Sequence, residues 1–420
     1  MHFPTPRIPT LSRNLALCGA LCGALGGLTI AAAAGAQGTD ATPAAQRVQA
    51  EVDKVLESYL IGPKAASELG CRVKWQTRVA LRDGVALKMV SSSPRAVLAL
   101  TGRNELTLVR PDSGDIAWVA SAADPVDRVV GLGVFDTRSG GSSDSERIAV
   151  MTDAVYYVLG FDSGSTLRRD RFVHVPNTTP EQVGNSFVYG TSAGQLSWLN
   201  CATGNDSFAH AIDALRGPSP VVAAPALAEG AVVGGNLRGG VIAIEAASGR
   251  LLWTKRLLAG VRATPAVANG IAFVSSDDQY LYAFDLASGE ELWKYFTQTP
   301  LSSSPFAAGD IVVQDVPGEG LVALTQNPDS KLGGEVRWRR PSVMGTAITT
   351  IGDGIVFWCA KCRAATIVSM KDGSTIRKVE LPAVTDLEAD TLERGGFVAW
   401  GADGRVERLA PIARATASSN

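Results

Sequence analysis

Two stretches of the chain, GVIAIEAASGRLLW at residues 240–253 and YLYAFDLASGEELW at residues 280–293, follow one pattern. In each, an apolar segment leads into a Ser-Gly turn, and a Trp follows four residues after the glycine. Short apolar runs bounded by turn residues are typical of β-strands. The pattern therefore predicts a strand, a tight turn and a second strand that carries the Trp.

Weaker copies of the pattern surround these two stretches and give the chain a period. With the glycines at 249 and 289, the turn glycines lie at positions 114, 164, 204, 249, 289, 334 and 373. Their spacings are 50, 40, 45, 40, 45 and 39 residues, which is the length of one four-stranded propeller blade. The longest interval contains the polar segment 137–146, which we interpret as a surface loop inserted into the second blade.

We interpret the repeated glycine and aromatic positions as structural. A glycine permits the positive φ that such a turn needs, and a Trp that packs between blades buries about 200 Å². The positions concerned are Trp75, Gly114, Trp118, Gly204, Gly249, Trp253, Gly289, Trp293, Gly334, Trp338 and Gly373.

The two ends of the repeat region complement each other. Residues 396–409 supply a second and a third strand without a fourth, whereas residues 72–77 look like a fourth strand alone. An N-terminal strand that completes the last blade leaves no blade with an open edge. We therefore predict an all-β fold, an eight-bladed β-propeller of four-stranded antiparallel blades over 70–412. Seven blades is the alternative count, because the copy around Gly164 is degenerate.

Residues 1–36 have the features of a secretory signal peptide. Arg7 and Arg13 precede the apolar stretch 15–30, and Ala34-Gly35-Ala36 offers a small-residue cleavage site. The alternative is a retained membrane anchor. We predict an exported protein in the periplasm or at the periphery of the outer membrane.

Two further segments complete the expected organisation. Residues 37–69 form a linker, in which apolar spacing over 46–60 predicts a short amphipathic helix that caps the propeller or binds a partner. Residues 413–420 read as a flexible tail.

The cysteines indicate neither a lipid anchor nor a disulfide scaffold. Leu17 and Leu21 precede Cys18 and Cys22, where a lipoprotein signal has a small residue, so the sequence does not favour lipidation. After cleavage the chain keeps four cysteines, of which Cys71 and Cys201 are expected to stay unpaired in different blades, with Cys359 and Cys362 as the remaining two.

Cys359-Ala-Lys-Cys362 falls in a predicted hairpin between a second and a third strand. Attachment of a c-type haem needs a His after the second Cys, and Arg363 stands there. A redox-active dithiol is usually placed at a helix N-terminus, which a hairpin lacks. A local structural disulfide is the main interpretation, and free thiols or a redox pair are the alternatives.

The charge of the chain argues against two classes of partner. The formal net charge is −2, and removal of 1–36 with its two Arg residues changes it to −4. A mildly acidic surface argues against nucleic acid and against anionic membrane as main partners. Only His174 and His210 remain outside the signal segment. Two histidines are few for a metal site, a haem site or general-base catalysis, so the sequence does not favour these kinds of chemistry.

The repeat resembles the PQQ-like repeat, in which the turn and its Trp read approximately Leu-Tyr-Ala-Leu-Asp-x-x-Thr-Gly-x-x-x-Trp. Residues 281–293 match best, residues 241–253 next, and the resemblance extends thinly over about 70–410. Exported chains of eight such blades resemble the BamB family of outer-membrane assembly factors. That resemblance implies a scaffold without enzymatic activity, which docks onto the barrel-assembly machinery or other envelope proteins.

The same repeat occurs in quinoprotein dehydrogenases, which hold PQQ over a calcium ion at the propeller axis beside a catalytic Asp. Those enzymes often carry an adjacent Cys-Cys disulfide against the quinone, and no Cys-Cys pair occurs in this chain. We therefore predict a non-catalytic, monomeric protein-binding propeller with no catalytic, cofactor-binding or metal residues. A PQQ-dependent oxidoreductase with calcium, or another propeller that binds a small ligand, is the alternative.

Overall fold

The computed structural model describes residues 54–55, 58–137, 145–213, 217–327 and 333–412. These residues belong to one compact unit, 54–420. The predicted signal peptide 1–36, the tail 413–420 and most of the helix predicted over 46–60 lie outside the described residues, although residues 54, 55 and 58 are helical. No helix in the described part is long and apolar enough to cross a membrane.

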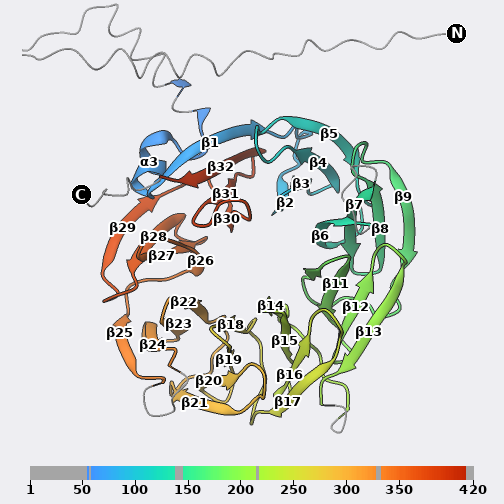
Figure 1. Cartoon of the computed structure of the whole chain (residues 1–420). Coiled ribbons are helices and arrows are strands. Elements are labelled where there is room, and N and C mark those ends of the chain that lie inside the picture. Colours follow the sequence, from blue (N-terminus) through green and yellow to red (C-terminus); the bar gives the residue numbers. More distant parts are fainter. Residues whose placement is uncertain (1–53, 56–57, 138–144, 214–216, 328–332, 413–420) are drawn as a thin grey trace, which may run out of the picture. The chain divides into compact units, whose positions relative to one another are not determined.

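Eight four-stranded antiparallel sheets form a ring, which confirms the eight-bladed propeller (Figure 1). Blade 1 consists of β2 (Leu87–Ser92), β3 (Val97–Thr101), β4 (Glu105–Val109) and β5 (Ile116–Ser121). Blade 2 consists of β6 (Val129–Asp136), β7 (Glu146–Thr152), β8 (Val155–Gly160) and β9 (Thr166–Arg171). Blade 3 consists of β10 (Glu181–Val183), β11 (Ser186–Gly190), β12 (Gln195–Asn200) and β13 (Asn205–Ala211). The copy around Gly164 is thus a complete blade, and the count of seven is wrong.

The next three blades are the most regular. Blade 4 consists of β14 (Ala226–Ala228), β15 (Ala231–Gly235), β16 (Gly240–Glu245) and β17 (Leu251–Arg256). Blade 5 consists of β18 (Ala266–Ala268), β19 (Ile271–Ser275), β20 (Tyr280–Asp285) and β21 (Glu291–Phe296). Blade 6 consists of β22 (Phe306–Ala308), β23 (Ile311–Val316), β24 (Gly320–Thr325) and β25 (Val336–Arg340).

The last two blades flank the point where the ring closes. Blade 7 consists of β26 (Thr346–Ile351), β27 (Gly354–Cys359), β28 (Ala364–Ser369) and β29 (Thr375–Glu380). Blade 8 consists of β30 (Asp386–Ala389), β31 (Phe397–Trp400), β32 (Arg405–Pro411) and the N-terminal β1 (Cys71–Arg78). The register of β1 against β32 runs from Cys71 opposite Pro411 to Arg78 opposite Arg405.

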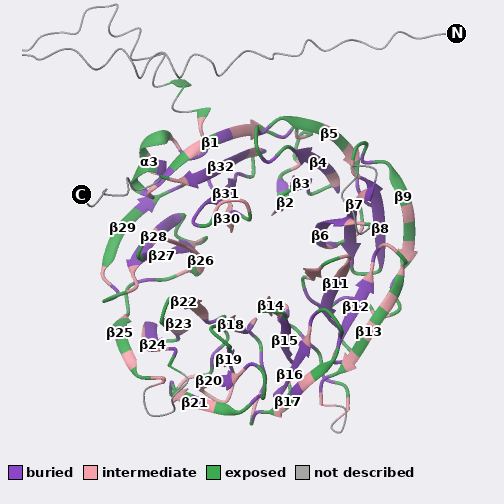
Figure 2. Cartoon of the chain, in the orientation of Figure 1, coloured by how far each residue is buried: buried purple, intermediate pink, exposed green. Residues whose placement is uncertain are grey.

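The core lies between neighbouring blades. The second and third strands of each blade are buried on both faces, as in β15 and β16, so they are apolar throughout rather than alternating. The fourth strands line the outer rim and alternate, as in β17 and β21 (Figure 2). The first strands surround the axis of the ring (Figure 1).

The turn glycine and the Trp of the repeat meet across a blade interface, in a contact that we call the latch. Trp253 of blade 4 packs on Gly289 of blade 5 so closely that a Cβ on the glycine would lie 2.5 Å from the indole. The indole Nε1 also donates a hydrogen bond to the carbonyl oxygen of Leu286, at 2.8 Å. Packing and hydrogen bond recur at four more interfaces: Trp75 with Gly114 and Pro111, Trp118 with Gly164 and Phe161, Trp293 with Gly334 and Asn327, and Trp338 with Gly373 and Met370.

Other side chains replace the Trp at two interfaces. Arg168 stands four residues after Gly164 and donates to the carbonyl oxygens of Cys201 and Ala202 in blade 3. Phe208 packs on Gly249, and His210 makes the hydrogen bond to the Gly249 carbonyl oxygen at 2.7 Å. Blade 2 thus lacks the aromatic residue but keeps the contact, which is why its sequence looks degenerate.

The seam between blades 7 and 8 has no latch, because the third and fourth strands of blade 8 come from opposite ends of the chain. The short helix α3 (Pro63–Glu68) packs there, with Leu60, Ile61 and Leu69 in the same apolar cluster. Glu407, which is fully buried, accepts hydrogen bonds from the backbone N–H groups of Leu60 at 3.1 Å and Ile61 at 2.9 Å.

Candidate functional site

The ring has two distinct faces. Strands alternate in direction, so the hairpins between second and third strands lie at the same ends as the connections between blades, on what we call the connection face. Backbone hydrogen bonds tie these segments together, for example from Ala122 N–H to the Asn104 carbonyl and from Leu257 N–H to the Gly239 carbonyl. The other two hairpins of each blade lie on the opposite face.

The inter-blade connections carry the most exposed of the large apolar side chains in the described part of the chain. Val126, Leu258, Val173 and Met344 are 92, 88, 74 and 63% exposed. They come from four connections, those after β5, β17, β9 and β25, so they all belong to the connection face. Apolar residues on the outer strands are less exposed, as Leu167 shows at 53%. Contiguous exposed apolar patches are typical of surfaces that bind other proteins, and these four side chains share one face, each on a separate connection.

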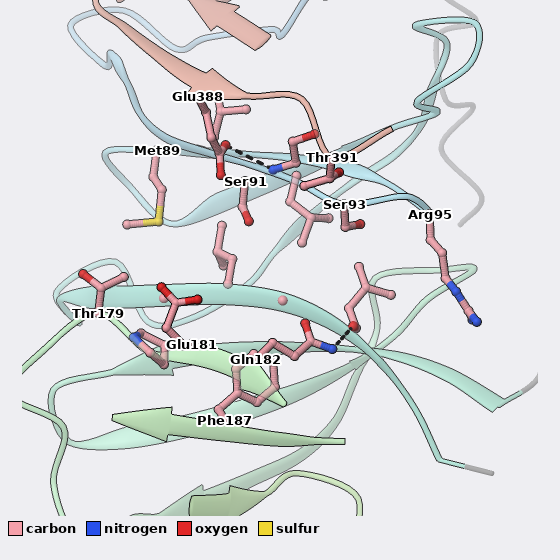
Figure 3. A pocket seen from close by; sticks show the side chains of 18 of the residues that line it. Met89, Ser91, Ser93, Arg95, Thr179, Glu181, Gln182, Phe187, Glu388 and Thr391 are labelled. Atoms are coloured by element: carbon pink, nitrogen blue, oxygen red, sulfur yellow. Dashed lines mark hydrogen bonds between the residues drawn. The ribbon is translucent and has the colours of Figure 1, made fainter. Parts of the chain in front are cut away.

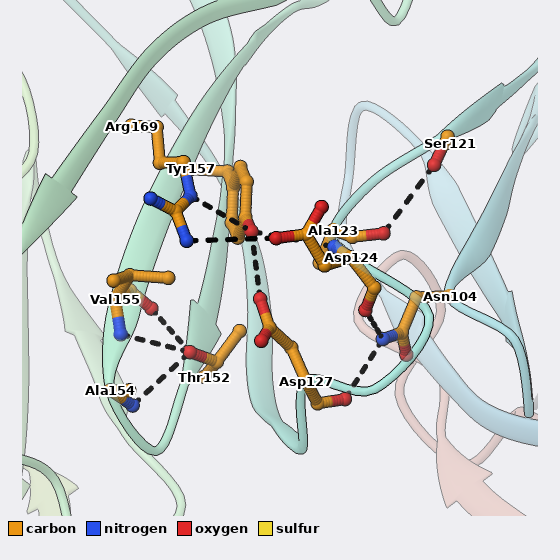
Figure 4. A network of polar contacts seen from close by, with 10 residues as sticks. All are labelled: Asn104, Ser121, Ala123, Asp124, Asp127, Thr152, Ala154, Val155, Tyr157 and Arg169. Carbon is orange, nitrogen blue, oxygen red and sulfur yellow. Dashed lines mark hydrogen bonds and ion pairs between the residues drawn. The ribbon is translucent and has the colours of Figure 1, made fainter.

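The connection that carries Val126 is braced by polar contacts (Figure 4). Tyr157 of blade 2 donates a hydrogen bond to Asp127 at 2.7 Å and accepts one from Arg169 at 3.1 Å. From blade 1, the amide of Asn104 donates to the carbonyl oxygens of Asp124 and Asp127. Because the loop is held from both blades, its apolar tip is presented without a large loss of conformational entropy on binding.

The second candidate is a cavity of about 660 Å³ at the axis, lined by the first strands of blades 1, 2, 3 and 8 (Figure 3). Gly133 of β6 allows the close approach of blade 3, since a Cβ there would clash with Phe187 and Gln182. This approach brings Glu181 of β10 to the cavity wall. Glu388 of β30 lies across from it (Figure 3).

The carboxylates of this axial cavity are poorly compensated. Glu388 accepts one hydrogen bond, from the Ser92 backbone N–H at 3.2 Å. Burial and, after it, repulsion from Asp386 and Glu181 raise the pKa of Glu388 to about 7. Burial also raises the pKa of Glu181. Arg95 is the one basic residue in the lining, and it forms ion pairs with Glu146 and Asp136.

These residues do not fit PQQ with calcium. PQQ carries three carboxylates, which proteins hold with basic side chains, but the cavity presents carboxylates and an Arg that is already paired. No group of three or more His, Cys, Asp or Glu residues in the described part of the chain could hold a metal ion.

One Ser, His and Asp lie together, but their geometry does not suit nucleophilic catalysis. His174 Nδ1 is 2.6 Å from Asp206 Oδ2, and Ser197 Oγ is 3.5 Å from the same nitrogen. A catalytic triad needs the serine and the aspartate at different ring nitrogens, so that the ring passes a proton between them. Ser197 is also fully buried.

The structure joins Cys359 and Cys362 in a disulfide within the hairpin between β27 and β28, on the connection face. Cys71 and Cys201 are free and buried. Burial raises the pKa of each of these two thiols to about 12, which keeps them protonated and unreactive.

The repeated positions named from the sequence lie at blade interfaces, away from the axial cavity and from the exposed tips of the connections. Sequence reasoning missed Glu181 and Glu388, which are 207 positions apart and belong to no motif. It also missed Val126 and Leu258, since single apolar residues in loops carry no signal until a common face is known.

Comparisons with known proteins agree with the repeat. The family described as outer membrane protein assembly factor BamB matches residues 213–356. BamB of Salmonella typhimurium is 25% identical over 214 residues, which cover 46% of this chain and 50% of the relative. The matched part spans 32 to 50% of the length of the first curated relatives.

A solved structure and an enzyme also match. The crystal structure of BamB from Moraxella catarrhalis has a TM-score of 0.58 and 20% identity, and the match covers 81% of this chain and 99% of that one. Quinoprotein ethanol dehydrogenase of Pseudomonas aeruginosa is 38% identical over 71 residues, only 16% of this chain and 11% of the enzyme. The repeat, the ring of eight blades and these matches together show an eight-bladed β-propeller that is similar to the PQQ-like propeller of the assembly factor BamB.

Proposed function

We propose that the protein is a non-catalytic scaffold of the cell envelope, which works outside the cytoplasm in the assembly of outer-membrane proteins. The observation that carries the proposal is the connection face, where apolar tips stand on inter-blade connections and the connection that carries Val126 is braced. The similar BamB proteins are outer-membrane protein assembly factors, which supports a role in this kind of process. Its partners are components of the barrel-assembly machinery or other envelope proteins, bound by one copy of the propeller.

The energetic basis of the proposal is the burial of these tips. Full burial of a Val or Leu side chain contributes about 1.5–3 kcal/mol, so two or three tips supply a large part of a micromolar affinity. The tips come from different blades, and the rigid ring fixes their mutual spacing. A partner with matching apolar depressions would therefore bind several of them at once.

The test is crosslinking in cells of a tagged copy, followed by mass spectrometry of the captured proteins. We expect barrel-assembly components with the wild-type protein and about a tenfold lower yield with Val126→Glu combined with Leu258→Glu, because a charge cannot enter an apolar contact without a partner. Leu167→Glu, on the outer rim, is the matched control and should leave capture unchanged. Wild-type capture of no envelope protein would reject the proposal.

The short match to a quinoprotein dehydrogenase keeps a quinone-dependent oxidoreductase as the second candidate. The acidic lining of the axial cavity weighs against it. Titration of the purified protein with PQQ and calcium separates the two functions, since an oxidoreductase would change the fluorescence of the quinone and reduce a dye.

A further inference from the structure

The disulfide between β27 and β28 is accessible, and the hairpin does not depend on it for closure. Cys362 is exposed and Cys359 is half-buried, whereas the free thiols of Cys71 and Cys201 are buried. The backbone ladder already closes the hairpin, since Cys359 is paired with Ala364 in the register of the two strands. Exposed disulfides are the ones that react with external thiols, because the attacking sulfur needs access.

The turn favours one of the two sulfurs as the leaving group. The backbone N–H of Cys362 donates a hydrogen bond to Cys359 Sγ at 3.0 Å, and the exposed Lys361 stands between the two cysteines. An N–H donor and a nearby ammonium stabilise a thiolate, and a more stable thiolate leaves a disulfide faster. The turn thus supplies the donor that a helix N-terminus supplies in other dithiol sites. Cys359 is therefore the leaving sulfur, and the more exposed Cys362 is the one that is attacked.

Contacts that do not involve sulfur hold the backbone of the turn. Arg363, whose φ is 51°, accepts a hydrogen bond at its carbonyl oxygen from the Leu381 N–H at 2.7 Å. The guanidinium of Arg363 donates to the carbonyl oxygen of Val384. Both contacts tie the turn to the connection after β29. The N–H that faces Cys359 therefore keeps its place when the disulfide opens, and a bond from it to a thiolate is stronger than one to a neutral sulfur.

An apolar side chain borders the turn and indicates the kind of thiol. Gly345 lies against the backbone of Cys359, so that a Cβ on the glycine would be 3.0 Å from the Cys359 nitrogen. Met344, the preceding residue, is 63% exposed. A thiol carried by a polypeptide with apolar residues beside it would bury Met344, whereas a small hydrophilic thiol would not. Met side chains adapt to varied apolar partners, which favours polypeptide thiols.

We propose that the Cys359–Cys362 disulfide is transferred to a pair of thiols in an apolar polypeptide segment. A thiolate of the segment attacks Cys362 Sγ, a bond between the two molecules forms, and the Cys359–Cys362 bond breaks with its electron pair left on Cys359. The second thiolate of the segment then attacks the bridged sulfur of its own chain, which forms the new disulfide and releases Cys362 as a thiolate.

One round of this exchange is balanced without another oxidant. The segment loses two electrons, which reduce Cys359 and Cys362, and its two thiol protons reach these two cysteines by way of solvent. Exchange at this turn goes beyond the scaffold function, because it does not depend on which proteins the connection face binds.

The experiment follows one round of exchange in the purified full chain at pH 8 without oxygen. The probe is an excess of a short peptide with two cysteines, separated by two residues and flanked by leucines. Acid stops the reaction, and alkylation with peptide mapping measures the free thiols of Cys359 and Cys362. We expect the peptide to reduce this disulfide about tenfold or more faster than it reduces oxidised glutathione, whose leaving thiolate has no fixed N–H donor.

Two charge variants separate a local effect from the overall charge. Lys361→Glu should slow the reduction about threefold or more, because a negative charge at the turn opposes both the incoming and the leaving thiolate. Lys371→Glu makes the same change at an exposed position of the hairpin between β28 and β29, on the opposite face, and should leave the rate unchanged. Circular dichroism checks that both variants are folded.

A third variant tests the class of thiol. Met344→Ser should slow the reaction with the leucine peptide about threefold, because less apolar surface is buried in the encounter. The same variant should react with dithiothreitol, a small hydrophilic dithiol, at the rate of wild type.

Several results would overturn the inference. A rate no faster than that of oxidised glutathione would show a disulfide that only supports its hairpin. Equal rates for Lys361→Glu and Lys371→Glu would show that the turn does not stabilise the leaving thiolate. If Met344→Ser changed both reactions alike, the assignment to polypeptide thiols would be wrong. None of these results bears on the scaffold function, which depends on the capture of envelope proteins in cells.

Discussion

The interface between blades 4 and 5 and the seam between blades 7 and 8 join neighbouring sheets by different means. At the first, Trp253 lies on Gly289 and donates to Leu286, and the residues involved are close in sequence. At the seam, Arg377 stands where the Trp would be and is exposed, since blade 8 has no turn to receive it. Contacts between residues 346 positions apart, from Ile61 to Glu407, hold that part of the ring.

The difference separates two kinds of stability. A latch buries a large aromatic side chain and satisfies its one donor, so its strength depends little on pH. The seam relies on a buried carboxylate, whose charge is set by pH, and on a helix that precedes the repeat. We therefore expect the interfaces that have a latch to be destabilised most by the loss of side-chain volume. The seam should be destabilised most by a change in the charge of its buried carboxylate.

The largest expected effect is at a latch. Trp253→Ala should lower the free energy of unfolding by about 3–5 kcal/mol, because it leaves a cavity between two blades. Trp253→Phe keeps much of the packing and loses the bond to Leu286, which costs about 1 kcal/mol. Arg377→Ala, at the corresponding exposed position of the seam, should change the free energy of unfolding by less than about 0.5 kcal/mol. Urea unfolding followed by circular dichroism measures all three, and equal losses at 253 and 377 would contradict the comparison.

A smaller effect is expected at the seam, where Glu407 responds to pH. Burial raises the pKa of Glu407 from 4.5 to about 7, while the bonds from Ile61 and Leu60 lower it. The folded protein thus holds this proton more tightly than the unfolded chain does. The contribution to stability is fully present below about pH 4.5 and is lost as pH rises through about 7. The loss between pH 5 and pH 8 amounts to at most about 3 kcal/mol.

Glu407→Gln should remove this part of the pH dependence. The amide oxygen of Gln still accepts the two N–H bonds, so the variant should be more stable than wild type at pH 8 and similar at pH 5. The remaining slope comes from Glu388, which shifts in the same direction. Thermal unfolding of both proteins at the two pH values tests this, with Trp253→Phe as a control that keeps the wild-type slope. If the stability of the Gln variant depended on pH as steeply as that of wild type, Glu407 would not be the group that titrates.

The smallest effect is expected at the Cys359–Cys362 disulfide, which lies in blade 7 beside the seam. A bond that closes a loop of a few residues constrains the unfolded chain little, by about 2 kcal/mol or less. Replacing both cysteines with Ser should lower the melting temperature by only a few degrees, and a reductant should shift wild type by the same amount. A much larger loss would show that this hairpin also holds the ring closed.

The sequence predicted the regular part of the ring better than its closure. Glycine and Trp recur because the latch needs both residues at one distance, so Gly249 to Trp293 could be read without a structure. The residues that form the seam follow no repeated pattern in the sequence. Glu407, for example, appears only as one acidic residue in an apolar strand. The fourth strand around Trp75 was nevertheless predicted to complete blade 8, because an edge without a partner was left at each end.

The candidate sites could not be predicted because each is made by distant parts of the chain. Glu181 and Glu388 line one cavity only because blades 3 and 8 face the same axis, and no local pattern encodes that arrangement. Arg168 is a different case. It stands at the position of the Trp and, although it has no aromatic ring, it still donates a hydrogen bond to the next blade. A comparison of motifs therefore scores blade 2 as degenerate although its contact with blade 3 is kept.

The pairing of β1 with β32 has a consequence for how the chain is made. β1 emerges from the ribosome early, and its partner strand follows only after more than 300 further residues. At a synthesis rate of 5–20 residues per second, β1 waits roughly 20–70 s without its partner strand. An unpaired strand edge is a template for aggregation. Late ring closure thus gives a chaperone, or a competing copy, a period in which to capture the nascent N-terminal strand.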